Sequence, residues 1–294
     1  MADLENADSD PFAFRPRLLA VAYRMLGSTA DAEDAVQDAY VRFQQAADVL
    51  NAEAWLVKTT TRLCIDRLRQ ARRRKEYHGS WLPEPVSDEW PGADRSNNHL
   101  AESLSMAFLV MLETLSPAER AAYLLREVLG YEFDEIARLL ETSSVNTRQL
   151  TARARKRLGA KDRRFTPSPQ EADQLAEKFF VACQSGDLEA IESFLTKDAT
   201  LYSDGGGKVH AAPKPVSGRR RIAKLLAVVF RRVQRIGELA FTTVNGQPGV
   251  VFTVDGQVME IFSIDGHAGG VETVFVMLNP DKLRRWESPR PRSR

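Results

Sequence analysis

The stretch from Phe133 to Leu158 constrains the fold of this chain most, because it has the pattern of two helices joined by a tight corner. In its first part, apolar residues recur at i, i+3, i+4 and i+7, which is one buried stripe of a helix. These residues are Phe133, Ile136, Ala137 and Leu140. After a corner at 141–143, the second part has a thin inner face of small residues: Val145, Thr147, Thr151, Ala154 and Leu158. The pattern predicts a helix-turn-helix.

The outer face of the second helix is strongly basic. It carries Arg148, Gln149, Ala152, Arg153 and Lys156, with Arg155 and Arg157 at its flanks. A major groove admits one helix and presents base edges to bidentate donors. We therefore expect Arg148, Gln149 and Arg153 to read base edges, and Arg155, Lys156 and Arg157 to contact phosphates. The alternative is a helical hairpin whose basic face is only solvated.

The distribution of charge favours nucleic acid as a partner. The net charge of the 294 residues is only +1, but cations cluster at 67–75 and at 148–164. Because salt screens charges beyond about 10 Å, such local clusters matter more than the total. The first cluster lies at the end of a long helix expected from about 52 to 75. Repulsion among its cations is relieved most simply by a bound polyanion.

Length and composition set further limits. With 294 residues and 43% hydrophobic residues, the chain should form two or three compact units. Cys64 and Cys183 are far apart in apolar surroundings, which predicts buried free thiols. The four histidines have no ligand spacing, so neither a metal nor a cofactor is expected. The N-terminus is acidic and polar, and no apolar run approaches the roughly 20 residues that span a bilayer. We expect a cytoplasmic protein without a membrane partner.

Two linkers divide the chain. The segment 79–100 contains Trp81-Leu82-Pro83-Glu84-Pro85-Val86, in which the prolines favour an extended path. We expect Trp81 to dock on a neighbouring domain. A second linker is expected at 161–170. Between the linkers, Ser116-Pro117-Ala118-Glu119 has the pattern of a capping box that opens a helix.

The residues after the second linker change character. Two helices, a strand near 199–203 and a helix near 219–235 precede four strand-like runs, at 239–244, 250–254, 257–264 and 271–278. Asn-Gly and Asp-Gly dipeptides separate these runs, as in hairpin turns. The pattern predicts an α+β module with a curled antiparallel sheet.

The helical half resembles an extracytoplasmic-function (group IV) sigma factor of bacterial RNA polymerase. The matching segments are 31–38, 54–74, 115–120 and 133–158, in the family's order. The C-terminal part resembles a cone-shaped, SnoaL-like domain, and 81–85, 204–208 and 279–283 resemble the signature of the sigma subfamily that carries it. The resemblance implies two all-α sigma domains followed by an α+β SnoaL-like domain. The expected boundaries are 12–78 for sigma domain 2, 101–160 for sigma domain 4, and 171–284 for the C-terminal domain.

The resemblance also implies roles by position. Core RNA polymerase would bind Asp34, Gln37 and Asp38, on a polar helix face that solvation alone could also explain. The −10 promoter element would meet Lys58, Thr59, Arg62, Asp66, Arg67 and Arg69. The −35 element would meet Arg148, Gln149, Ala152, Arg153, Arg155 and Lys156. The loop 45–51 would capture an unstacked base, although it lacks an aromatic platform.

The C-terminal domain is expected to control the sigma domains in cis. We expect the linker residues Trp81, Pro83 and Pro85 to meet two other segments. These segments comprise Asp204, Gly205, Gly206, Gly207 and Lys208, and Asn279, Pro280, Asp281 and Lys282. The glycine-rich loop lacks the spacing of a phosphate-binding P-loop. No catalytic residue is assigned.

Two alternatives stay open at this point. One is a ligand-controlled helix-turn-helix regulator that binds DNA without polymerase. The other is a bifunctional protein whose C-terminal domain is an enzyme using Tyr202, Asp204 and His210. The sequence does not identify a small-molecule ligand for that domain.

Overall fold

A computed structural model describes residues 10–70, 79–93, 103–159, 169–267 and 269–286. The chain forms two compact units. The first comprises residues 1–75, 89–104 and 108–161, and the second comprises 76–88, 105–107 and 162–294. The basic residues at 71–75, the linker residues 94–100 and most of the second linker lie outside the described residues.

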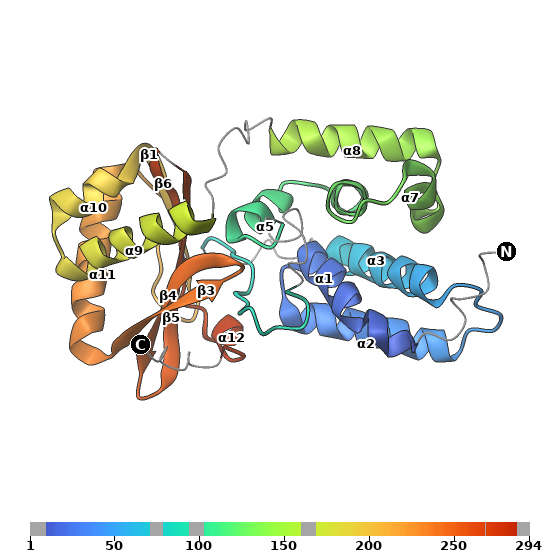
Figure 1. Cartoon of the computed structure of the whole chain (residues 1–294), viewed down its shortest axis with the longest axis horizontal. Helices are drawn as coiled ribbons and strands as arrows, with labels where there is room; N and C mark the ends of the chain where they lie inside the picture. Colours follow the sequence, from blue (N-terminus) through green and yellow to red (C-terminus); the bar gives the residue numbers. More distant parts are fainter. Residues whose placement is uncertain (1–9, 71–78, 94–102, 160–168, 268, 287–294) are drawn as a thin grey trace. The chain divides into compact units, whose positions relative to one another are not determined.

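The first three helices build one half of the first unit (Figure 1). A 3-10 helix η1 (Pro11–Phe14) leads into α1 (Arg15–Leu26), α2 (Thr29–Gln44) and α3 (Ala52–Gln70). Helix α1 ends at Gly27, whose positive φ of 66° suits glycine, and Ser28 then caps α2 by accepting a hydrogen bond from the Asp31 N–H. Helix α1 is buried along residues 18–26 and contacts both α2 and α3.

The other half of this unit contains the expected helix-turn-helix. Its helices are α5 (Met106–Leu112), α6 (Pro117–Tyr123), the π-helix η3 (Leu124–Val128), α7 (Phe133–Leu140) and α8 (Ser144–Leu158). The predicted capping box is confirmed, since Ser116 and Glu119 exchange both of its hydrogen bonds. The prediction that Val145 lies on the inner face of α8 was wrong, since it is 66% exposed, and Leu150, which the pattern left out of that face, is buried with Thr147, Thr151 and Ala154.

Buried arginines join the two halves of the first unit. Arg120, in α6, is 3% exposed and donates to the carbonyl of Met25 at 2.7 Å and to that of Leu112 at 2.6 Å. Arg24, in α1, is 2% exposed and donates to Ser103 Oγ at 2.8 Å. Helix α3 contacts α6 and α7. These buried charges have hydrogen-bonded partners, which is the condition for burying a guanidinium at acceptable cost.

The second unit is an α+β fold, as predicted. Its helices are α9 (Pro169–Ser185), α10 (Leu188–Phe194), α11 (Arg219–Ile236) and α12 (Pro280–Leu283). Its strands are β1 (Leu195–Asp204), β2 (Val216–Ser217), β3 (Glu238–Val244), β4 (Gln247–Val254), β5 (Gln257–His267) and β6 (Gly270–Met277). They form one sheet in the order β2-β1-β6-β5-β4-β3.

The sheet is mixed, so the prediction of a purely antiparallel sheet was wrong. Strand β1 pairs with β6 in parallel, with Tyr202 opposite Phe275, while β3 to β6 form antiparallel hairpins. The chain passes through α11 between β1 and the hairpins, and such a crossover permits parallel pairing. The short strand β2 was not predicted, since two residues carry too little pattern.

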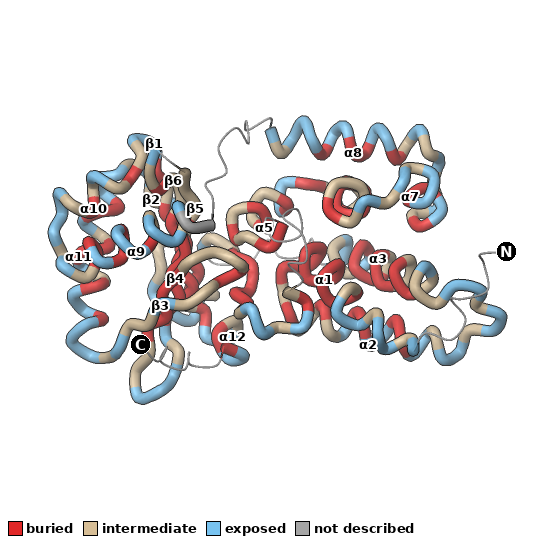
Figure 2. The backbone as a smooth tube through the Cα atoms, in the orientation of Figure 1, coloured by how far each residue is buried: buried red, intermediate tan, exposed pale blue. Residues whose placement is uncertain are grey.

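Aromatic side chains fill the space between the sheet and its helices. Phe179, Phe180, Phe230, Phe252 and Phe262 are each at most 2% exposed and belong to one apolar cluster. Figure 1 shows α9, α10 and α11 along one side of the sheet, and Figure 2 shows buried residues on their inner sides. These side chains form the apolar core between the sheet and its helices.

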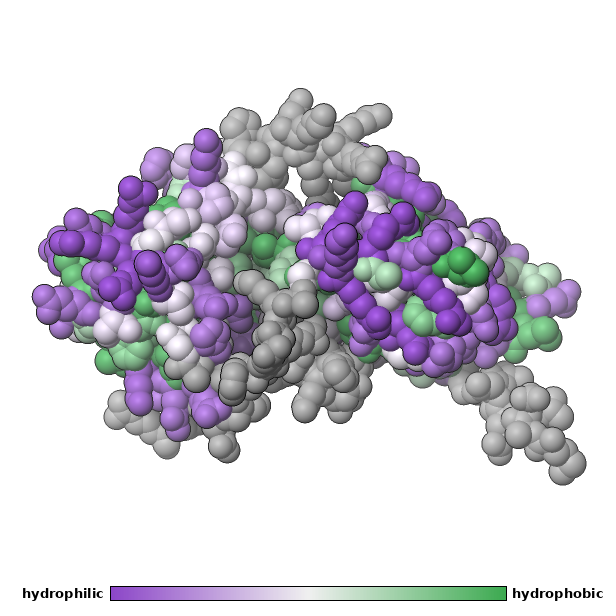
Figure 3. Space-filling model, turned by 90° about the horizontal axis from the view of Figure 1, so that it is seen from above, coloured by the Kyte–Doolittle hydropathy of each residue, from purple (hydrophilic) through white to green (hydrophobic). Residues whose placement is uncertain are grey.

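Two smaller features complete the fold. The thiols of Cys64 and Cys183 are free and buried, as predicted, and burial raises their pKa values, that of Cys64 to about 12. None of the described helices is both long and apolar enough to cross a bilayer. On the face drawn in Figure 3, hydrophobic residues form separate small patches among hydrophilic ones.

Candidate nucleic-acid interface

The basic face of α8 is accessible along its whole length. All six residues expected at the −35 element are exposed: Arg148, Gln149, Ala152, Arg153, Arg155 and Lys156. Five of them share the side of α8 opposite its buried residues, and Arg155 lies at the flank. The helix begins at its N-cap Ser143, whose hydroxyl accepts from the Asn146 N–H at 3.1 Å. Small buried residues keep its packing face thin. The face that remains has the donors and the width needed to enter a major groove.

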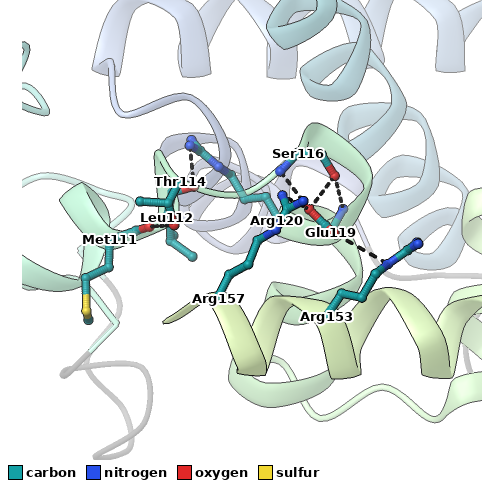
Figure 4. Close-up of polar contacts among 8 residues, drawn as sticks. All are labelled: Met111, Leu112, Thr114, Ser116, Glu119, Arg120, Arg153 and Arg157. Carbon is teal, nitrogen blue, oxygen red and sulfur yellow. Dashed lines mark hydrogen bonds and ion pairs between the residues drawn. The ribbon is translucent and has the colours of Figure 1, made fainter. Parts of the chain in front are cut away.

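Carboxylates hold some of these arginines in place (Figure 4). Glu119, only 3% exposed, lies 3.5 Å from Arg153 Nε and 2.7 Å from Arg157 Nη1, so the capping box of α6 also anchors α8. Burial raises the pKa of Glu119, but hydrogen bonds from Ser116 and the cations of Arg157 and Arg153 outweigh it and hold that pKa below its usual value. Arg155 is paired with Glu127 at 2.6 Å.

Arg148 has no carboxylate partner among the described residues, and its guanidinium lies over the ring of Phe133 at 4.9 Å from the centroid. A cation–π contact of this kind orients the guanidinium while leaving its five donors available. Arg148 at the start of α8 is therefore better prepared to read a base edge than Arg153, which must share its donors with Glu119.

The residues expected at the −10 element are less accessible. Lys58, Thr59 and Arg62 lie on α3 and are half-buried. Glu141, at the corner of the helix-turn-helix, forms ion pairs with both cations: one oxygen lies 3.2 Å from Lys58 Nζ and the other contacts Arg62. Glu141 has a positive φ of 49°, a conformation that disfavours residues with a Cβ. The first unit thus brings the corner of the helix-turn-helix against residues that were expected to meet the −10 element.

The remaining residues of this set are tied to neighbours. Arg67 donates to Asp38 Oδ2 at 2.7 Å and to the Asp31 carbonyl at 2.6 Å, so a residue expected to bind DNA is paired with one expected to bind polymerase. Asp66 and Arg69 pair with each other at 3.3 Å. On α2, Asp34 and Gln37 are exposed beside Asp38.

The loop 45–51 has one property that sequence reasoning missed. Leu50 is 97% exposed, and Asp48 has a positive φ of 56°. A leucine so fully exposed in a short loop offers an apolar surface against which an unstacked base can pack. The signal in the sequence was the apolar pair Val49-Leu50 between Asp48 and Asn51.

The linker residues 81–86 are anchored within the second unit. Asp204, fully buried, accepts from the Leu82 N–H at 2.9 Å and from Lys282 Nζ at 2.7 Å through the same oxygen. Lys282 also donates to the Leu82 carbonyl and lies 4.4 Å from the centroid of the Trp81 ring. Three segments far apart in the sequence therefore share one buried ion pair.

Asn245 is a second anchor, which the sequence analysis did not identify. Its N–H donates to the Val86 carbonyl at 2.8 Å, and its side-chain oxygen accepts from the Val86 N–H at 3.1 Å. Asn245 is fully buried and has the positive φ of the Asn-Gly turn between β3 and β4. The dipeptide read as a simple hairpin turn thus also holds the linker.

The glycine loop and the tail meet closely. Lys208 is paired with Asp281, and a Cβ at Gly206 would fall 2.4 Å from Asn279 Nδ2. The Asp204 side chain also accepts from the Gly206 N–H at 2.9 Å. Pro280 opens α12, whose N-cap is Asn279. The Asp204 carboxylate is engaged in these contacts, Tyr202 stacks on Phe275, and His210 is exposed. The three residues of the enzymatic alternative therefore have separate surroundings.

The architecture and the exposed basic helix define a class: helical promoter-recognition domains of the sigma-70 type. Residues 13–74 match the family described as Sigma-70 region 2, and residues 105–158 match Sigma-70, region 4.

Known proteins extend the likeness beyond these two regions. The chain is 36% identical over 246 residues to the ECF RNA polymerase sigma factor SigJ of Mycobacterium tuberculosis, covering 81% of this chain and 78% of that protein. It is 27% identical over 281 residues to the probable ECF sigma factor SigI of the same organism, with 92% of each covered. The crystal structure of M. tuberculosis SigJ superposes with a TM-score of 0.72 at 32% identity, covering 92% of this chain and 96% of that one.

The chain belongs to the extracytoplasmic-function sigma factors, which direct RNA polymerase to initiate transcription. Its helical domains are sigma regions 2 and 4, and they are followed by an α+β domain with a six-stranded sheet. Such factors bind core RNA polymerase and promoter DNA, and the family is not enzymatic.

Proposed function

We propose that this sigma factor reads the −35 element through the exposed face of α8 and the −10 element through α3, while α2 binds core polymerase. In α8, Arg148, Gln149 and Ala152 face base edges, while Arg155 and Lys156 contact phosphates. In α3, Lys58, Thr59 and Arg62 contact the −10 strand. The accessibility of the whole outer face of α8 supports its part in this assignment.

The role of α3 requires a change of partners. In the described first unit, Glu141 neutralises Lys58 and Arg62. A phosphate group can replace that carboxylate only if α3 and the helix-turn-helix separate. Exposed ion pairs of this kind contribute only about 0–1 kcal/mol each, so binding to polymerase and DNA readily overcomes them. On this proposal, the free chain binds DNA weakly, and binding to core polymerase exposes α3.

The C-terminal domain controls this separation through the linker. A flexible chain of about 20 residues spans roughly 25 Å. Anchoring 81–86 to Asp204, Lys282 and Asn245 removes that segment from the tether and shortens its reach. The single observation that carries this proposal is the buried Asp204–Lys282 pair that also binds both backbone groups of Leu82.

Transcription from a cognate promoter, measured beside core-polymerase affinity, tests the control in cis. Breaking a buried ion pair costs about 3–5 kcal/mol, so Asp204→Ala should release the linker. The expected result is altered transcription, with unchanged affinity for core polymerase. Lys208→Ala, which breaks a more exposed pair with Asp281, should have a smaller effect of the same sign. Unchanged transcription in Asp204→Ala, with a folded C-terminal domain, would contradict the proposal.

A gel shift with and without core polymerase separates the sigma mechanism from a regulator that binds DNA alone. We expect promoter binding only in the presence of core polymerase. Tight, sequence-specific binding by the free chain would contradict the assignment of α3 and α8.

A further inference from the structure

Helix α11 of the C-terminal domain has a concentration of positive charge that the functions above do not use. Its 18 residues contain no acidic residue and seven basic ones: Arg219, Arg220, Arg221, Lys224, Arg231, Arg232 and Arg235. The net charge of the whole chain is only +1, so this helix does not reflect a general excess of cations.

The fold places these cations on one face. Ile222, Leu226, Phe230 and Val233 are at most 1% exposed and bury the opposite face against the sheet and neighbouring helices. With 3.6 residues per turn, the cations are directed outward. Arg221, Lys224, Arg231 and Arg235, at i, i+3, i+10 and i+14, form a stripe about 20 Å long. We call these four residues the α11 stripe, and Figure 2 shows the alternation of buried and exposed residues along this helix.

The α11 stripe is not neutralised within the domain. Arg219 is paired with Glu192 at 3.2 Å, and Arg232 is paired with Glu260. These nearby carboxylates therefore pair with cations beside the stripe and not with the stripe itself. Within the described ranges, none of the four stripe residues forms an ion pair. Like charges three or four residues apart, such as Arg221 with Lys224 and Arg231 with Arg235, each cost a few tenths of a kcal/mol. A bound polyanion would remove this cost.

We propose that the α11 stripe binds the sugar–phosphate backbone of duplex DNA that flanks the promoter elements, a proposal that rests on the proposed function. Guanidinium groups match phosphate geometry with two parallel hydrogen bonds. A stripe of about 20 Å corresponds to about six base pairs of duplex at 3.4 Å each. Because α11 buries a broad face of six residues in its domain, only a shallow stripe of the helix is exposed, and it cannot enter a groove. Its contacts are therefore with phosphates and independent of sequence.

A membrane surface fits this helix poorly. Interfacial helices insert a free apolar face between lipid headgroups, whereas the apolar face of α11 is the core of its domain. Val228, 64% exposed, and Ile236, 55% exposed, are isolated apolar side chains beside the cations and do not form a continuous apolar face. An acidic protein surface, including that of the polymerase, is a different partner, which the experiment distinguishes.

The experiment compares two variants of equal charge in the complete holoenzyme. The stripe variant carries Lys224→Gln, Arg231→Gln and Arg235→Gln. The control variant carries Lys178→Gln, Lys197→Gln and Lys214→Gln, which removes three exposed cations from other surfaces of the same domain. Binding is measured against salt concentration on two promoter fragments with identical −35 and −10 elements, one with about 20 additional base pairs of flanking duplex on each side and one without.

On the long fragment, we expect the stripe variant to bind at least tenfold more weakly than the control at ordinary salt. The slope of log affinity against log salt should become less steep by about 2–3, since each lost phosphate contact removes about 0.9. On the short fragment, the two variants should be equal. Thermal unfolding of both variants checks that the domain remains folded.

The opposing outcomes are distinct. Equal slopes for the two variants on the long fragment would overturn the proposal. A stripe variant that assembles less well with core polymerase in the absence of DNA would assign the stripe to a protein partner and also overturn it. If the unaltered holoenzyme fails to bind even the short fragment, the proposed function itself fails.

Discussion

Helices α8 and α11 are both basic and amphipathic, but they are packed in different ways. Helix α8 buries Thr147, Leu150, Thr151 and Ala154, whereas α11 buries Ile222, Ala223, Leu226, Ala227, Phe230 and Val233. A narrow packing face leaves most of the circumference of α8 free to enter a groove. The broad packing face of α11 leaves only a shallow stripe. Positive charge alone therefore does not define a sequence-reading helix, because the width of the buried face decides how deeply the helix can reach.

The two helices also differ in how their cations are held. Glu119 and Glu127 position Arg153, Arg155 and Arg157 of α8, while the α11 stripe has no such partners in the part of the chain that the structure describes. In α8 these pairs fix the cations that flank the base-reading residues, whereas cations without such partners provide general attraction for phosphates. The following changes test this contrast.

The largest expected effect is on packing. Phe230→Ala should lower the free energy of unfolding of the C-terminal domain by about 3–5 kcal/mol, since Phe230 is fully buried against Phe180 and Phe262. Thr151→Ala in α8 should cost about 1 kcal/mol, because a smaller volume is lost. Chemical denaturation of both variants measures the difference, with the exposed Val228→Ala as the control. Equal losses in the two helices would remove the contrast in packing.

The next effect is on discrimination between promoters. Arg148→Ala should cost about 1–3 kcal/mol on the cognate −35 sequence and much less on an altered one, because a base contact is lost. Lys156→Ala should weaken binding to both sequences to the same extent and reduce the salt slope by about 1. Competition binding with holoenzyme checks both. A uniform loss in Arg148→Ala would place its contact on the backbone.

A smaller effect should depend on pH. Glu119 has a lowered pKa in the folded chain, so its ionised form contributes stability above its unfolded-state pKa, and this contribution is lost as pH falls through the lower folded value. Glu119→Gln retains a side chain suited to the capping box but loses the charge that holds Arg153 and Arg157. We expect Glu119→Gln to lower the free energy of unfolding by about 0.5–1 kcal/mol at neutral pH, and this difference to disappear in acid. A difference that persists in acid would show that packing, not charge, links α6 to α8.

The smallest change in stability is expected for Glu141→Gly. Glycine relieves a left-handed backbone that costs about 1 kcal/mol, while the two lost ion pairs contribute about the same in total. The amine of Lys58 should nevertheless react several times faster with an acylating reagent, as read by mass spectrometry. Glu132→Gln, which breaks the pair with Arg126 in the same region, should leave Lys58 unchanged. An unchanged Lys58 in Glu141→Gly would indicate that α3 is covered by other contacts.

Local patterns determined much of what the structure contains. The period of the apolar residues, the capping serine Ser116 and the turns at Asn245-Gly246 and Asp255-Gly256 gave the helices, two of the hairpins and the helix-turn-helix. The third expected turn, Asp265-Gly266, was wrong, because both residues lie inside β5. These signals are short-range: a cap needs residues two or three positions apart, and a turn of this type needs a positive φ at two adjacent residues. The resemblance to ECF sigma factors also came from the sequence and is confirmed by the relatives and by the SigJ structure.

Tertiary structure decided the features that join distant segments. The parallel pairing of β1 with β6, the ion pairs of Glu141 with α3 and the clamp of Asn245 on Val86 each link residues more than 60 positions apart. No local pattern encodes such partners, because a charged or amide side chain has the same neighbours in the sequence whether it meets solvent or a distant segment. The period of the apolar residues fixed which side of each helix is buried. Only the folded chain fixed which segments that side packs against and which partner each neighbouring charge finds.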